Sequence, residues 1–104
     1  MELEASLDAI NKVIESNSVV VFSKSYCPFC VKAKNLLNDV YPKYIAYELN
    51  NMENGGKIQD LLMKKTNQKT VPNIFIGNEH IGGCDSLFKL NESGKLENML
   101  KALP

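Results

Sequence analysis

The feature that most constrains this chain is a Cys-x-x-Cys pair directly after a short apolar run. Val19 to Phe22 are four consecutive apolar residues, rich in β-branched and aromatic side chains, which predicts a strand buried on both faces. A polar segment, Ser23 to Tyr26, connects this run to Cys27-Pro28-Phe29-Cys30. Apolar residues then recur at helical spacing, at Val31, Leu36, Leu37 and Val40. Two cysteines are therefore expected where a central strand turns into a helix.

This position gives the first cysteine a distinctive chemistry. Pro28 fits the first helical turn, so Cys27 should face unpaired backbone N–H groups and the positive end of the helix dipole. Such placement lowers a thiol pKa from about 8.5 to between about 3.5 and 7, and Lys24 adds positive charge nearby. A lower pKa raises the fraction of Cys27 that is thiolate but lowers the nucleophilicity of that thiolate, and the two effects nearly cancel. The clear benefit is that Cys27 becomes a better leaving group when a second thiol attacks its mixed disulfide. Cys30, one turn on, should be shielded and able to form a disulfide with Cys27.

The rest of the chain alternates between helical and strand patterns. Leu3, Leu7, Ile10 and Ile14 form one helical stripe, and strands are expected at about 19–24, 44–49, 73–77 and 80–82. The dithiol helix should end near Asp39, and further helices are expected at 57–65, from an N-cap at Asp85, and around residues 96–103, with a loop at 50–56. The first two strands should be parallel, whereas the Gly77-Asn78 turn makes the last two antiparallel.

Size and composition limit the function classes. The 104 residues predict one domain, residues 1–104. The formal net charge is zero and the chain has no Arg, which argues against a nucleic-acid binder. No apolar run exceeds four residues, so no membrane-spanning segment is expected. The first residues do not have the pattern of a secretory signal, and an odd number of cysteines does not suit a secreted disulfide framework, so we expect a cytoplasmic protein.

A zinc site is the main alternative use of the cysteines. Zinc needs four ligands, usually with a second ligand pair, and this chain offers only Cys27, Cys30, His80 and Cys84. Pro28 between the cysteines, with a helix starting there, suits redox chemistry better.

Three motifs together resemble those of a known family. Cys27-Pro28-Phe29-Cys30 after Lys24, Thr70-Val71-Pro72, and Gly82-Gly83-Cys84-Asp85 look like a dithiol glutaredoxin over about residues 12–101. The resemblance implies an α/β fold of the thioredoxin type, with a four-stranded mixed sheet flanked by helices on both faces. Across that sheet the strands would run 44–49, 19–24, 73–77 and 80–82. It also implies a cis proline at Pro72, beside the active cysteine.

The resemblance also implies an activity. Glutathione would be co-substrate and electron donor, and Cys27 alone would reduce protein–glutathione mixed disulfides. Cys30 would be needed only for protein disulfides. The implied partners are glutathione and glutathionylated or disulfide-containing proteins, with no metal, no nucleic acid and no membrane, and the protein would be a monomer.

The family's glutathione site carries over onto this sequence. Lys24 and Gln59 would meet the glycine carboxylate, and the Val71 backbone would pair with the cysteinyl part like an added strand. Cys84 and Asp85, at a helix start, would hold the γ-glutamyl end. Each of these residues also has a purely structural interpretation when it is taken alone. Gln59 would be a solvated helix residue, Asp85 would be a helix cap, and Cys84 would be a thiol packed in the core. The full set of glutathione-binding positions is Lys24, Phe29, Gln59, Thr70, Val71, Pro72, Gly83, Cys84 and Asp85.

One position departs from the family pattern. Phe29 stands where the commonest motif has Tyr, so the ring can flank glutathione but the hydroxyl is gone.

Two rival functions use similar motifs. A thioredoxin-type reductase would carry Gly-Pro between the cysteines and a Trp, both absent here. A carrier that binds a [2Fe–2S] cluster through Cys27 and two glutathiones would have Cys-Gly-Phe-Ser, whereas this chain has Pro28 and Cys30.

Overall fold

The structure is a computed structural model that describes residues 2–104. Its elements, in chain order, are α1 (Leu7–Ser16), β1 (Val19–Ser23), α2 (Pro28–Val40), β2 (Ile45–Glu48), the 3-10 helix η1 (Leu49–Asn51), α3 (Gly55–Thr66), β3 (Asn73–Ile76), β4 (Glu79–Gly82), α4 (Cys84–Glu92) and α5 (Lys95–Lys101). Apart from η1, this is the order of helices and strands that the sequence predicts.

The four strands form one mixed sheet in the order β2-β1-β3-β4. β1 pairs with β2 in parallel, and both β1–β3 and β3–β4 are antiparallel. Gly77 and Asn78 both have positive φ, at 57° and 69°, as a tight turn between β3 and β4 requires. The predicted strand order and directions are confirmed.

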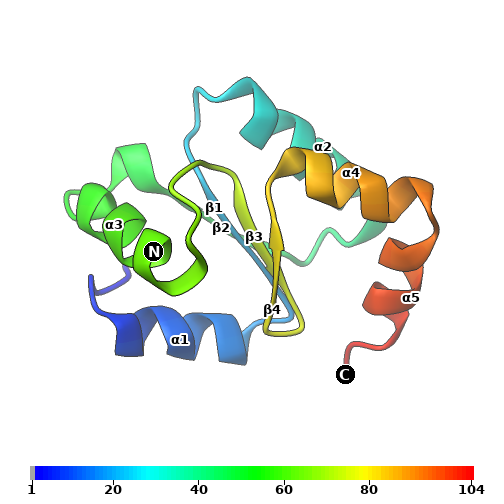
Figure 1. Ribbon diagram of the computed structural model, residues 1–104, viewed down its shortest axis with the longest axis horizontal. Helices are drawn as coiled ribbons and strands as arrows, with labels where there is room; N and C mark the ends of the chain where they lie inside the picture. The colour runs from blue at the N-terminus through cyan, green and yellow to red at the C-terminus, as the bar shows by residue number, and fades with distance from the viewer. Residues whose placement is uncertain (1) are drawn as a thin grey trace.

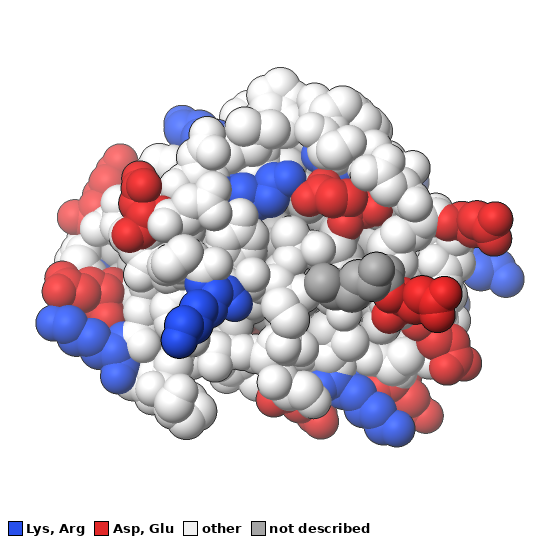
Figure 2. All heavy atoms as spheres, turned by 180° about the vertical axis from the view of Figure 1, so that it is seen from behind, with Lys and Arg blue, Asp and Glu red and all other residues white. Residues whose placement is uncertain are grey.

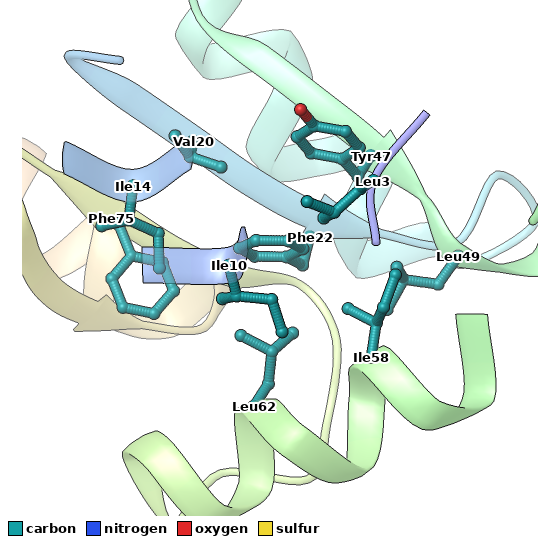
Figure 3. Close-up of a cluster of buried hydrophobic side chains, with 10 residues drawn as sticks. All are labelled: Leu3, Ile10, Ile14, Val20, Phe22, Tyr47, Leu49, Ile58, Leu62 and Phe75. Carbon is teal, nitrogen blue, oxygen red and sulfur yellow. The ribbon is translucent and has the colours of Figure 1, made fainter. Parts of the chain in front are cut away.

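The sheet has an apolar core on each face. Val20 and Phe22 of β1 point to the face covered by α1 and α3, where Phe22 stacks on Tyr47 with ring centroids 5.7 Å apart (Figure 3). Val19 and Val21 point to the other face, which α2, α4 and α5 cover (Figure 1). Every residue of β1 is buried, which confirms the prediction of a strand covered on both sides.

The N-terminal helix is shorter than its apolar stripe suggests. Ser6 is the N-cap and its hydroxyl accepts a hydrogen bond from the Ala9 N–H at 3.1 Å, so α1 starts only at Leu7. Leu3 precedes the helix yet is buried in the core, whereas Leu7 on the helix is 38% exposed. The predicted stripe is therefore wrong in two respects, because the helix begins only after the Ser6 cap: Leu3 is buried but not helical, and Leu7 is helical but exposed.

The buried face of α2 agrees with the predicted one only in part. Leu37 is buried and Leu36 packs against the core, as predicted, whereas Val31 and Val40 are 42% and 40% exposed. The helix also buries Cys30 and Ala33, which lie with Leu37 on one face at spacings of three and four residues. Cys27 is the N-cap, so Cys30 lies in the first turn of α2, and its burial belongs to the same helix face as that of Ala33 and Leu37.

Three element boundaries differ from the predicted ones. β2 ends at Glu48, and η1 and α3 occupy most of the expected 50–56 loop. α3 starts at Gly55, where an added Cβ would collide with the Leu49 carbonyl. The N-cap of α4 is Gly83, not Asp85. Asp85 lies inside the first turn, where a carboxylate is also favoured by the helix dipole.

Charge is mixed over the surface. Figure 2 shows lysines and acidic residues interspersed on the face it draws, with no all-basic area. Among residues 2–104, no helix combines the length and apolarity needed to cross a membrane.

Candidate active site

The two motif cysteines lie at the junction of β1 and α2. Cys27 is the N-cap of α2 with extended backbone angles, φ −81° and ψ 120°, and Pro28 is the first helical residue. Both cysteines are free thiols; Cys27 is partly exposed, whereas Cys30 is fully buried. Cys27 is therefore reachable from solvent, whereas Cys30 is not.

The surroundings of Cys27 favour its thiolate. Burial of the sulfur acts to raise the pKa of Cys27, but hydrogen bonds from the backbone and thiol of Cys30, a backbone hydrogen bond from Phe29 and the charge of Lys24 outweigh it. The net pKa is lowered. Backbone N–H groups in the first helical turn have no intrahelical acceptor, so those of Phe29 and Cys30 can bind the sulfur and contribute to the lowered pKa.

Cys30 has the opposite environment. Burial raises its pKa, and a hydrogen bond from the Lys24 backbone only partly offsets this. The Lys24 N–H donates to Cys30 Sγ at 3.4 Å. Cys30 therefore keeps its proton to higher pH than Cys27.

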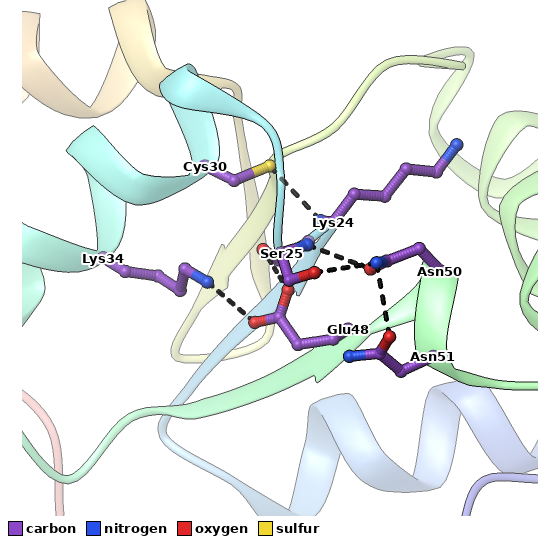
Figure 4. Close-up of polar contacts among 8 residues, drawn as sticks. Lys24, Ser25, Cys30, Lys34, Glu48, Asn50 and Asn51 are labelled. Carbon is purple, nitrogen blue, oxygen red and sulfur yellow. Dashed lines mark hydrogen bonds and ion pairs between the residues drawn. The ribbon is translucent and has the colours of Figure 1, made fainter.

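A chain of polar contacts runs beneath this turn (Figure 4). The Ser23 hydroxyl donates to Glu48 Oε1 at 2.8 Å, and Lys34 Nζ lies 2.8 Å from Glu48 Oε2. Ser23 and Glu48 are register partners in the parallel β1–β2 pair, and Lys34 is one helical turn beyond Cys30. The sequence reasoning did not single out these three residues, although a serine ending an apolar strand was a visible signal.

A groove opens beside the cysteines. The Cys27 thiol donates to the Val71 carbonyl oxygen, with Sγ and O 3.9 Å apart, and the Val71–Pro72 peptide bond is cis, as the resemblance implied. The groove has a volume of about 350 Å³. Its lining residues are Phe29, Thr70, Val71, Pro72, Gly83, Cys84, Asp85 and Ser86. Seven of these were named from the sequence, and Ser86 was not.

Two of the expected binding residues lie outside this lining. Gln59 Nε2 donates to the Lys69 carbonyl oxygen at 2.7 Å. Lys24 acts on Cys27 through its charge. Neither residue lines the groove, so the structure does not bring these two together with the other seven predicted positions.

The third cysteine belongs to the groove wall. Cys84 is the first residue of α4 and is 5% exposed. Burial raises its pKa; the charge of Lys32 opposes this, whereas Asp85 and Cys27 add to it. This thiol is thus less ionised than Cys27.

The structure does not assemble the alternative zinc ligands. His80 Nε2 lies 2.9 Å from Asn73 Oδ1 and 3.2 Å from Gln68 Oε1, so this ring nitrogen is hydrogen-bonded to side-chain amides. Within residues 2–104, no three His, Cys, Asp or Glu side chains are grouped as a metal site would need.

Known proteins with similar sequences decide the family. The sequence model of the glutaredoxin family matches residues 19–81. Glutaredoxin-2 of Schizosaccharomyces pombe is 51% identical over 94 residues, covering 90% of this chain and 86% of the relative. Glutaredoxin-C2 of Arabidopsis thaliana is 46% identical over 95 residues, covering 91% and 86%. The chain belongs to the glutaredoxin family.

Solved glutaredoxin structures share the fold. The buckwheat glutaredoxin–glutathione complex matches with a TM-score of 0.88 and 43% identity, covering 91% of this chain and 86% of that one. Wheat glutaredoxin matches with a TM-score of 0.86 and 46% identity, covering 90% and 89%. The thioredoxin fold is confirmed. Glutaredoxins are oxidoreductases that act on thiols and disulfides, so the chain is an enzyme of that class, and the [2Fe–2S] carrier alternative is not favoured.

Proposed function

We propose that this glutaredoxin uses glutathione as its co-substrate and reduces protein–glutathione mixed disulfides through Cys27. The observation that carries the proposal is the position of Cys27. Its pKa is lowered, and its thiol contacts Val71 at the edge of a groove of about 350 Å³. The buckwheat relative, whose structure is a glutathione complex, has the same fold.

The reaction proceeds by two thiol–disulfide exchanges. The Cys27 thiolate attacks the glutathione sulfur of the mixed disulfide, a Cys27–glutathione disulfide forms, and the substrate protein leaves as a thiolate that takes up a proton. A second glutathione thiolate then attacks the bound glutathione sulfur, releasing glutathione disulfide and the Cys27 thiolate. The same interactions that lower the Cys27 pKa make it a good leaving group in this second step.

The residues along the groove would orient glutathione, with its γ-glutamyl part at the start of α4 and its glycine carboxylate at the other end. The main chain of Val71 makes no backbone–backbone hydrogen bond among residues 2–104, so it is open to pair with the cysteinyl part like an added strand. The start of α4, with Cys84 and the exposed Asp85, would receive the γ-glutamyl end. Lys24 and Gln59 would meet the glycine carboxylate at the other end.

The remaining predicted positions form the walls of the groove. Phe29 is 60% exposed and its ring would cover the bound tripeptide, so we expect activity without the tyrosine hydroxyl. Pro72 lies beside Gly83, where an added Cβ would be 3.6 Å from the Pro72 carbonyl oxygen. Thr70 completes this side of the groove.

For protein disulfides we propose a dithiol path. Cys27 forms a mixed disulfide with the substrate protein, and Cys30 then attacks Cys27 Sγ to give an intramolecular disulfide and free the substrate. We further propose that glutathione is the only cofactor, that the enzyme acts as a monomer on glutathionylated and disulfide-containing proteins, and that it works in the reducing cytoplasm, where free thiols persist. The three free cysteines are consistent with that compartment.

The test compares Cys27→Ser with Cys30→Ser in a glutathione-dependent assay. Cys27→Ser should be inactive on both a glutathionylated peptide and a protein disulfide. Cys30→Ser should keep activity on the glutathionylated peptide and lose activity on the protein disulfide. An active Cys27→Ser enzyme, or a wild-type rate that does not depend on glutathione, would overturn the proposal.

A further inference from the structure

The side-chain amide of Gln68 holds residues 70–72, the segment that lies beside Cys27. Gln68 Nε2 donates to the Thr70 carbonyl oxygen at 3.0 Å and to the Pro72 carbonyl oxygen at 2.9 Å. A side-chain amide nitrogen has two hydrogens, so one nitrogen serves both carbonyls. The carbonyl between them, on Val71, accepts instead from the Cys27 thiol. Gln68 therefore binds the two residues that flank Val71 and leaves Val71 facing the active site.

The amide of Gln68 is itself fixed in orientation. His80 Nε2 lies between Gln68 Oε1, at 3.2 Å, and Asn73 Oδ1, at 2.9 Å. Both neighbours are acceptors, so this ring nitrogen carries a hydrogen and donates. With its oxygen held by His80, Gln68 must turn its NH₂ group toward Thr70 and Pro72.

The network is tied into the body of the fold. Asn73 at the start of β3 is 1% exposed, and its Nδ2 donates to Thr66 Oγ1 at 3.3 Å. That hydroxyl also accepts from the Gln68 N–H at 3.1 Å and donates to the Leu62 carbonyl oxygen at 2.8 Å. The end of α3, the start of β3 and β4 thus all brace the position of Gln68.

We propose that Gln68 is a positioning residue for glutathione, holding residues 70–72 so that the Val71 main chain is preset to pair with the ligand. This rests on the proposed function. Without the two hydrogen bonds, the segment would have to be ordered as glutathione binds. Ordering the backbone of one residue costs about a tenfold factor in the binding constant, so the loss should appear in KM and leave kcat nearly unchanged.

The test uses two substitutions at this position. Gln68→Ala removes both donors, and Gln68→Glu keeps the size of the side chain but turns an acceptor toward two carbonyl oxygens. We expect KM for a glutathionylated peptide to rise about tenfold in Gln68→Ala and further in Gln68→Glu, with kcat within about twofold of wild type. The ¹⁵N order parameter of the Val71 amide in the free enzyme should fall in both variants, because residues 70–72 lose the hydrogen bonds that hold them.

A matched control separates positioning from general stability. Asn54 Nδ2 also donates to a backbone carbonyl oxygen, that of Leu3, at 2.8 Å, but it lies outside the groove. Asn54→Ala should lower thermal stability and leave KM at the wild-type value. If Gln68→Ala also lowers stability without raising KM, the positioning role is wrong. If wild type itself shows no glutathione-dependent activity on the glutathionylated peptide, the proposed function fails instead.

Discussion

The contact between Gly55 and Leu49 gives the sharpest prediction about the scaffold of the site. A Cβ built on Gly55 would lie 1.9 Å from the Leu49 carbonyl oxygen and 2.7 Å from its carbonyl carbon. Both are backbone atoms of η1, directly after β2, so no side chain can move aside. Overpacking a fold commonly costs about 1–3 kcal/mol and sometimes more, and a collision with the main chain belongs at the upper end. We therefore expect Gly55→Ala to lower the free energy of unfolding by about 3 kcal/mol, even after the helix-propensity gain of about 1 kcal/mol for alanine.

Thermal and urea unfolding followed by circular dichroism would measure this. A loss of about 3 kcal/mol corresponds to a Tm lower by about 12–24 °C in a domain of this size. The matched control is Gly56→Ala in the same helical turn, where nothing lies within 4 Å of an added Cβ. That variant should gain about 0.5–1 kcal/mol from helix propensity. A folded Gly55→Ala protein as stable as wild type would refute the reasoning.

Two further predictions concern the active-site turn. Iodoacetamide should label Cys27 with a pH midpoint below the ordinary thiol value of about 8.5, because its neighbours lower its pKa; a midpoint at or above 8.5 would contradict this. Since the fold favours the thiolate, the stabilising contribution of this group is present above the ordinary thiol pKa and is lost as pH falls through the lowered one. Lys34→Met should cost about 1–2 kcal/mol, between the values for buried and exposed ion pairs, because it leaves Glu48 unpaired where the two side chains are only 18% and 25% exposed. The surface pair of Lys101 and Glu97, at 72% and 71% exposure, is the control, and Lys101→Met should cost at most about 0.5 kcal/mol; equal losses in urea unfolding would argue against a special role for the Lys34 pair.

Local patterns predicted the elements well and the helix faces less well. The buried strand β1, the turn at Gly77 and the order of strands and helices all follow from short-range signals. The exposure of Leu7 and Val31 does not, because which face of a helix is buried depends on its cap and on what packs against it. For α2, burial of Cys30 selects a face that includes the small Ala33 and excludes the more hydrophobic Val31.

The supporting polar groups were the least predictable part of the site. Glu48 lies in an expected strand and Lys34 in an expected helix, and nothing in either local sequence shows that they form an ion pair. Gln68 is one polar residue in a polar loop. Its importance appears only once the hydrogen bonds to Thr70 and Pro72 are known.

The sequence alone determined that a dithiol stands at a strand-to-helix junction, with the first cysteine at the helix start and the second inside the first turn. These features depend on a few neighbouring residues, so local chemistry is enough to predict them. Only the tertiary structure decided that Val71 and Cys84 share one groove beside Cys27. They meet because β3 lies next to β1 in the sheet and α4 packs beside α2, which brings together segments more than 40 residues apart in the chain.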